Sequence, residues 1–169
     1  MSRPRTALLA LAAALLAGAC REPTPEPVRG RCEDAEPGVA CLEIAAGADA
    51  APVADGSEVE LVFGPQGGWH VEVGMRFLGI DTEGTLLTYE ARREEDGAIV
   101  STMRYGITPR RLGTDGDYRL RTGDLVVFDI TSADQIADRA ITIEARLEDE
   151  NGAEIASDVR TLEVVDLVP

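Results

Sequence analysis

Residues 64–77 read Gly-Pro-Gln-Gly-Gly-Trp-His-Val-Glu-Val-Gly-Met-Arg-Phe, and this stretch decides the fold. Its first five residues have the composition of a turn, because Pro65 fixes one backbone angle and the glycines adopt positive φ without strain. From residue 69 on, apolar residues fall at every second position. This period of two predicts a half-buried antiparallel strand. The side chains expected to face the core are Trp69, Val71, Val73, Met75 and Phe77.

The same alternation recurs along the rest of the chain. It predicts further strands at 42–45, 59–63, 85–92, 98–105, 125–130, 141–147 and 155–165. A segment rich in Ala, Gly, Asp and Pro at 45–57 is expected to be a loop, and one helical turn is expected within 132–139. Short strands joined by Gly/Asp turns, with no crossover helices, predict an all-β fold. We expect an immunoglobulin-like antiparallel β-sandwich of about seven to nine strands at 42–169.

The first twenty residues have the pattern expected of an export signal. Two arginines precede an apolar segment that is too short to span a bilayer, and small residues then lead directly to Cys20. This arrangement resembles a bacterial lipoprotein signal, with 1–19 cleaved and Cys20 acylated. The resemblance implies membrane attachment through palmitate-type chains, and Arg21 after the cysteine indicates the outer membrane. The alternative is an ordinary secretory signal that is cut at Ala19.

Residues 20–41 are expected to connect the lipid to the folded domain. Prolines at 23, 25 and 27 favour an extended polyproline II tether, which would reach roughly 30 Å. Cys32 and Cys41 are nine residues apart in an exported chain, which predicts a disulfide closing a small loop. A redox or metal-binding pair is the alternative, but the spacing is neither Cys-x-x-Cys nor that of a zinc knuckle.

The charge balance restricts the partners. The chain has 16 basic residues, all of them arginine, against 31 acidic ones, and its net charge is −15. Such an acidic chain repels phosphate backbones and anionic head groups, so we expect no nucleic-acid partner. Membrane contact is expected through the N-terminal lipid, and the folded domain is expected to bind an envelope protein or a glycan.

The run Gly-Pro-Gln-Gly-Gly-Trp-His resembles a segment that recurs in uncharacterised predicted lipoproteins of myxobacteria and their relatives. In those proteins a Gly-Pro-Gln-Gly-Gly-x-His run also follows a short apolar strand and precedes a longer alternating one. The resemblance implies the fold and the envelope location, and it implies no activity. Within the run, Gln66 and His70 are the candidate ligand contacts. The alternative is a purely structural turn.

No catalytic set is evident. His70 is the only histidine and the only candidate general base, and no Gly-x-Ser-x-Gly nucleophile motif occurs. A copper site built from His70, Met75 and Met103 is disfavoured, because Met75 is predicted on the opposite strand face from His70. Calcium at the acidic turns 115–117 and 149–151 is disfavoured because neither has the EF-hand pattern.

These observations predict a lipid-anchored, non-enzymatic binding module of the cell envelope, with no catalytic residue, no metal site and no cofactor. The alternatives are a periplasmic enzyme that uses His70 with a carboxylate, and a copper or calcium carrier.

Overall fold

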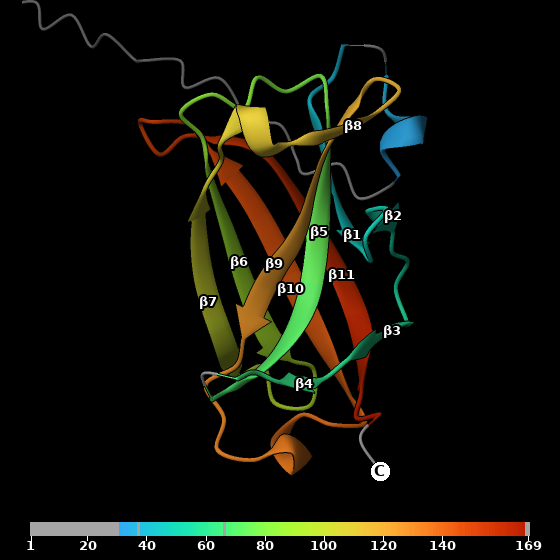
Figure 1. Ribbon diagram of the computed structural model, residues 1–169, viewed down its shortest axis with the longest axis vertical. Helices are drawn as coiled ribbons and strands as arrows, with labels where there is room; N and C mark the ends of the chain where they lie inside the picture. Colours follow the sequence, from blue (N-terminus) through green and yellow to red (C-terminus); the bar gives the residue numbers. More distant parts are fainter. Residues whose placement is uncertain (1–30, 37, 66, 168–169) are drawn as a thin grey trace, which may run out of the picture.

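The computed structural model describes residues 31–36, 38–65 and 67–167, and it shows a two-layer β-sandwich (Figure 1). The predicted signal peptide, most of the tether, Cys20 and Gln66 lie outside the described residues. The strands are β1 (Cys41–Ala46), β2 (Ala51–Pro52), β3 (Ser57–Glu60), β4 (Val62–Phe63), β5 (Trp69–Leu78), β6 (Leu86–Arg93), β7 (Ile99–Gly106), β8 (Gly113–Asp115), β9 (Tyr118–Val127), β10 (Arg139–Glu148) and β11 (Glu154–Val165).

Three short 3-10 helices complete the elements of the described segments. They are η1 (Cys32–Asp34), η2 (Pro109–Arg111) and η3 (Ala133–Gln135). The helical turn expected within 132–139 corresponds to η3, where the N–H of Ser132 donates to the side-chain oxygen of Gln135. Within the described part of the chain, no helix has the length and apolar character needed to cross a membrane.

The strand order is that of an immunoglobulin domain. Sheet A has the order β2-β1-β5-β9-β8, with β4 also paired to β5, and sheet B has the order β3-β11-β10-β6-β7. Strands β1, β5, β9 and β8 therefore correspond to the A-B-E-D sheet of such domains, and β11, β10, β6 and β7 to the G-F-C-C′ sheet. The prediction of an all-β immunoglobulin-like sandwich is confirmed. The described residues form eleven strands instead of seven to nine, and β3 is parallel to β11.

The central strand β5 has the two faces that its alternation predicts. Val71, Val73, Met75 and Phe77 are buried in the core between the sheets. Trp69 is only half-buried, because it lies at the end of the sandwich, where its ring packs against Phe63 with the centroids 5.0 Å apart. Glu72 is exposed and Arg76 is partly exposed on the opposite face. The sequence pattern therefore identified the inward face of this strand correctly.

The single strand predicted at 59–63 is instead two strands that belong to different sheets. β3 pairs with β11 in sheet B, and β4 pairs with β5 in sheet A. The switch occurs at Leu61, whose side chain is fully buried and whose N–H donates to the carbonyl of Val165 at 2.8 Å. The sequence hid this change of partner, because residues 59–63 read as one short apolar strand although both residues of β4 are exposed.

A β-bulge interrupts the antiparallel pairing of β5 with β9. Val73 faces Asp124 and Met75 faces Arg121, so β9 contains one residue more than β5 between these pairs. Gly123 has a φ of +76°, the conformation that this type of bulge requires of its glycine. On the facing strand, the backbone of β9 approaches Gly74 so closely that an added Cβ would lie 2.6 Å from the carbonyl oxygen of Arg121.

This close approach makes Gly74→Ala a destabilising substitution. The new methyl group would have to displace the backbone of β9 in the middle of a buried sheet, and we expect a loss of about 2 kcal/mol. Urea unfolding measures the effect. The control is Gly106→Ala at the end of β7, where an added Cβ meets nothing within 4 Å. If both variants unfolded at the same urea concentration, the packing described for β9 would be wrong.

Candidate functional site

His70 lies on the outer face of sheet A, in a row of cross-strand neighbours. It pairs with Val62 of β4 on one side and with Val127 of β9 on the other. In the next row, Glu72 pairs with Leu125 of β9. Leu125 is 37% exposed, so this end of the outer face presents apolar side chains around a single imidazole.

The loop between β4 and β5 forms one wall of a groove over this row. Its backbone closes on itself, because the N–H of Gly64 donates to the carbonyl of Gly68 and the N–H of Gly67 donates to the carbonyl of Gly64, both at 3.0 Å. The ring of His70 lies so close to Gly64 that an added Cβ would be 3.2 Å from Cε1. The absence of side chains at these glycines therefore lets the loop backbone lie directly against His70.

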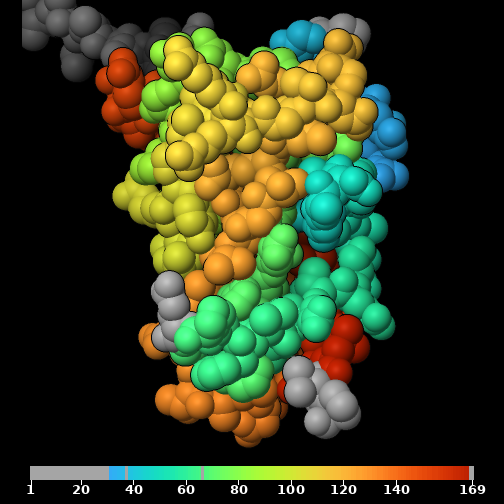
Figure 2. Space-filling view, in the orientation of Figure 1, coloured from blue at the N-terminus to red at the C-terminus, as the bar shows by residue number. Residues whose placement is uncertain are grey.

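The groove has a volume of about 220 Å³. Its lining comes from the loop and from β5 and β9: Gly64, Pro65, Gly67, Gly68, His70, Leu125 and Val127. In the space-filling view the residues of β4 and the start of β5 lie across the lower part of the face, below the side chains of β9 (Figure 2). The floor is apolar and one wall is peptide backbone, so the groove can accept an apolar group beside an imidazole.

Of the two candidate ligand contacts, His70 lines this groove and Gln66 lies outside the described residues. Among the side chains that the structure describes, none forms a hydrogen bond with the imidazole of His70. Sequence reasoning missed Leu125 and Val127, which antiparallel pairing brings beside His70 from more than fifty residues downstream. The available signal was the run Leu125-Val126-Val127, which is apolar on both faces of a predicted strand.

The two outer faces of the sandwich differ in chemistry. On sheet B, glutamates alternate with arginines that pair with them, as in Arg104–Glu148 at 3.2 Å and Arg92–Glu90 at 2.6 Å. On this face the carboxylates and guanidinium groups pair with one another and remain in contact with water. On sheet A, the end near β4 presents the apolar groove instead. This contrast identifies the sheet A groove as the candidate binding site.

The residues weighed for copper do not come together. Met75 is fully buried on the inner face of β5 and Met103 packs against the core, whereas His70 is on the outer face. Within the described ranges, no cluster of three or more His, Cys, Asp or Glu residues is arranged to hold a metal ion.

The acidic turns weighed for calcium are occupied by the protein's own groups. The carboxylate of Asp149 accepts hydrogen bonds from the N–H groups of Ala153 and Asn151, both at 2.8 Å, which hold the pKa of this carboxyl below its ordinary value. Asp115 lies 3.6 Å from the guanidinium of Arg76. Both carboxylates therefore have partners that stabilise the turns.

The predicted disulfide between Cys32 and Cys41 is present, with the two Cα atoms 5.6 Å apart. Both cysteines are buried, and Cys41 is the first residue of β1. The bond therefore joins η1 directly to β1 of sheet A.

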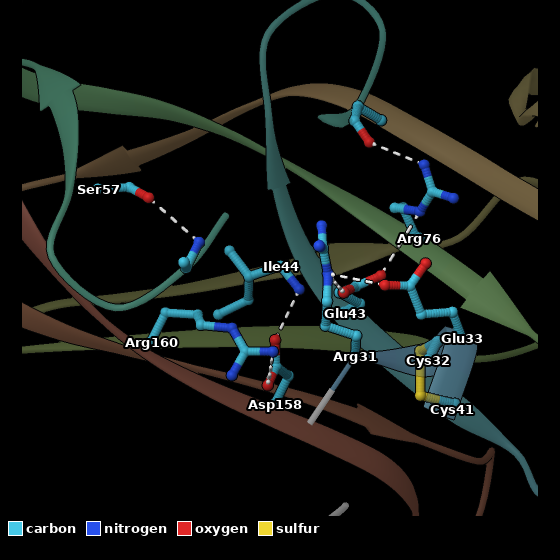
Figure 3. A network of polar contacts seen from close by, with 12 residues as sticks. Arg31, Cys32, Glu33, Cys41, Glu43, Ile44, Ser57, Arg76, Asp158 and Arg160 are labelled. Atoms are coloured by element: carbon cyan, nitrogen blue, oxygen red, sulfur yellow. Dashed lines mark hydrogen bonds and ion pairs between the residues drawn. A yellow bond between two sulfur atoms is a disulfide. The ribbon is translucent and has the colours of Figure 1, made fainter. Parts of the chain in front are cut away.

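Beside the disulfide lies a buried network of charges (Figure 3). Glu43 of β1 is only 2% exposed, and its carboxylate is 3.5 Å from Nε of Arg76 and 3.8 Å from Nε of Arg31. Arg76 also places its guanidinium 4.1 Å from the ring centre of Tyr118, a cation–π contact. Burial raises the pKa of the Glu43 carboxyl above its ordinary value of 4.5, although Arg76 and Arg31 oppose that shift.

The raised pKa predicts a specific pH dependence. The folded state holds the Glu43 proton to a higher pH than the unfolded state does. This contribution to stability is therefore complete below the pKa of the unfolded carboxyl and is lost as the pH rises through the folded pKa. Glu43→Gln lacks this loss, so its melting temperature relative to the parent chain should be higher at pH 7 than at pH 4. A difference in melting temperature that stayed constant with pH would contradict the prediction. Asp158, whose pKa burial also raises, is present in both proteins, and its charge is one of the causes that raise the pKa of Glu43.

No protein-family model matches the chain, and no curated protein matches its sequence. Among solved structures, the CooA pilin subunit from enterotoxigenic Escherichia coli is similar over 73% of this chain and 97% of its own, with 12% identity and a TM-score of 0.30. The N-terminal domain of PorA is similar over 73% of this chain and 96% of its own, with 10% identity and a TM-score of 0.31.

Proposed function

We propose that this chain is an exported protein, anchored in the cell envelope by lipid on Cys20, whose immunoglobulin-like domain is a non-enzymatic binding module. The domain engages an envelope protein or a glycan through the groove beside His70. The export signal and the tether support the location. The groove supports the mode of action.

The observation that carries this proposal is the apolar groove on the outer face of sheet A. Leu125 in the groove is 37% exposed, and the neighbouring Val62, which pairs with His70, is 36% exposed and extends the apolar surface beyond the groove itself. An exposed apolar patch of this kind, bounded by polar residues, is typical of an interaction site. The loop backbone is held in place by its own hydrogen bonds, so the site is formed before a partner arrives.

Leu125→Asp tests the binding role. The side chain is exposed, so the substitution should leave the fold intact while it places a charge on the floor of the groove. We expect the full chain, extracted gently from its own envelope, to migrate as a larger complex on native gels. Leu125→Asp should weaken that complex about tenfold, as expected for the loss of one buried leucine.

The matched control is Thr102→Asp, an exposed position on β7 of sheet B. It should leave the complex unchanged. If Thr102→Asp disrupted the complex and Leu125→Asp did not, the binding surface would be on the other sheet. The anchor is tested separately by labelling with an alkynyl fatty acid, which Cys20→Ser should abolish.

A further inference from the structure

We propose that the partner of this groove is a basic protein segment that inserts an apolar side chain between the β4–β5 loop and β9, at the end of the domain away from the anchoring membrane. This inference rests on the proposed binding function and names the chemistry of the partner.

Exposed glutamates lie along β3, next to β4. Val59 and Leu61 are buried, and the residues that alternate with them, Glu58, Glu60 and Val62, are exposed. Glu60 comes two residues before Val62, which pairs with His70, so the Cα atoms of Glu60 and Val62 lie at most about 7 Å apart along the chain. A carboxylate therefore stands beside the apolar residue that borders His70.

A further carboxylate, that of Glu72, lies at the other border of the groove. Glu72 is exposed and lies directly across from Leu125, whose side chain forms part of the groove floor. Within the described part of the chain, no arginine lies within ion-pair distance of Glu58, Glu60 or Glu72. On β6 and β10 of sheet B, by contrast, Glu90, Glu144 and Glu148 each have an arginine partner. The carboxylates around the groove are thus available to a partner, and they favour cationic groups.

The groove and the disulfide lie at opposite ends of β5. Cys41, which the disulfide links to η1, pairs with Leu78 at one end of β5, whereas Phe63 pairs with Trp69 at the other end. β5 has ten residues and so spans about 30 Å. Figure 1 shows η1 near the upper end of the long axis and β4 near the lower end. A domain held at its disulfide end therefore presents the groove away from the membrane.

An apolar floor with unpaired carboxylates around it fits a segment in which basic residues flank a leucine-like side chain. A glycan would be expected to stack on exposed aromatic rings. The described lining of the groove contains no Phe, Tyr or Trp. We therefore favour a protein segment, and glycan binding becomes one outcome of the test.

The test uses the only tryptophan of the chain as a reporter. Trp69 follows the loop directly and is half-buried, so a ligand in the groove should change its emission. The purified full chain is titrated with four probes: the capped peptides Arg-Arg-Leu-Arg-Arg, Arg-Arg-Ala-Arg-Arg and Glu-Glu-Leu-Glu-Glu, and a soluble oligosaccharide of N-acetylglucosamine. We expect the first peptide to bind most tightly, and the alanine peptide about tenfold more weakly.

Two variants separate the apolar and the charged contributions. Leu125→Asp should weaken binding of the leucine peptide about tenfold, and Glu60→Gln with Glu72→Gln should weaken it about fivefold and reduce its dependence on salt. The charge-matched control, Glu83→Gln with Glu150→Gln, removes two exposed carboxylates elsewhere and should change nothing.

The remaining outcomes overturn the inference. Equal binding of the basic and acidic leucine peptides would remove the charge argument. Binding of the oligosaccharide alone would identify a glycan site, and binding of no probe would reject a basic segment. If no probe bound while Leu125→Asp still disrupted the native complex, only the partner class would be wrong and the proposed function would stand.

Discussion

Asp124→Ala is expected to lower the free energy of unfolding by about 3 kcal/mol, because it leaves a charge and a hydroxyl without their partner inside the sandwich. Asp124 is only 4% exposed, and it lies on the inward face of β9 just after the bulge. Its carboxylate accepts a hydrogen bond from the hydroxyl of Tyr89 at 2.8 Å and from Nε of Arg121 at 2.6 Å. Urea unfolding followed by circular dichroism measures the loss.

Two control variants separate this effect from the general loss of a carboxylate. Tyr89→Phe removes one hydrogen bond and keeps the ion pair, so it should cost about 1 kcal/mol. Asp96→Ala removes a partly exposed ion pair with Arg93 and a turn hydrogen bond from the N–H of Ala98, and it should lower the midpoint clearly less than Asp124→Ala does. The account of the buried cluster would be wrong if Asp124→Ala and Asp96→Ala unfolded at the same urea concentration.

Loss of the Cys32–Cys41 disulfide is expected to cost about 3 kcal/mol in the chain-entropy model for a loop of this length. The bond also holds η1 against β1 and keeps Arg31 near the buried carboxylate of Glu43. Reductant should therefore lower the melting temperature of the parent chain. The double variant Cys32→Ala/Cys41→Ala should melt at that lower temperature with or without reductant. An unchanged melting temperature of the parent under reductant would show that the disulfide contributes nothing to stability.

The local pattern predicted much of the fold. Alternation identified β5, β6, β7, β10 and β11, because each of these strands has one face in the core. Partner choice did not follow from the pattern, since residues 59–63 read as one strand whereas β3 and β4 pair in different sheets. The alternation also did not predict residues 118–124, the first part of β9.

β9 shows the physical reason most clearly. The bulge at Gly123 shifts the inward positions, so the buried residues after it are Asp124 and Val126, whereas Arg121 points inward before it. An inward arginine and an inward aspartate look like surface residues in a sequence. They are tolerated in this position because they pair with each other and with Tyr89.

The candidate site was predictable only in part. The outward direction of His70 follows from its place between Trp69 and Val71, and the turn follows from Pro65 and the glycines. The groove requires Leu125 and Val127 as well, and their position depends on the register between β5 and β9. A register between distant strands is determined by the whole core, so it could not be obtained from the loop residues alone.

Site-specific photo-crosslinking in intact cells tests the binding function most directly. A photoreactive side chain is placed at position 125, on the floor of the groove, and in a parallel strain at position 102 on the outer face of sheet B. The account predicts one discrete adduct from position 125 and none from position 102. Adducts from position 102 with none from position 125, or the same adducts from both, would contradict a binding site in the groove.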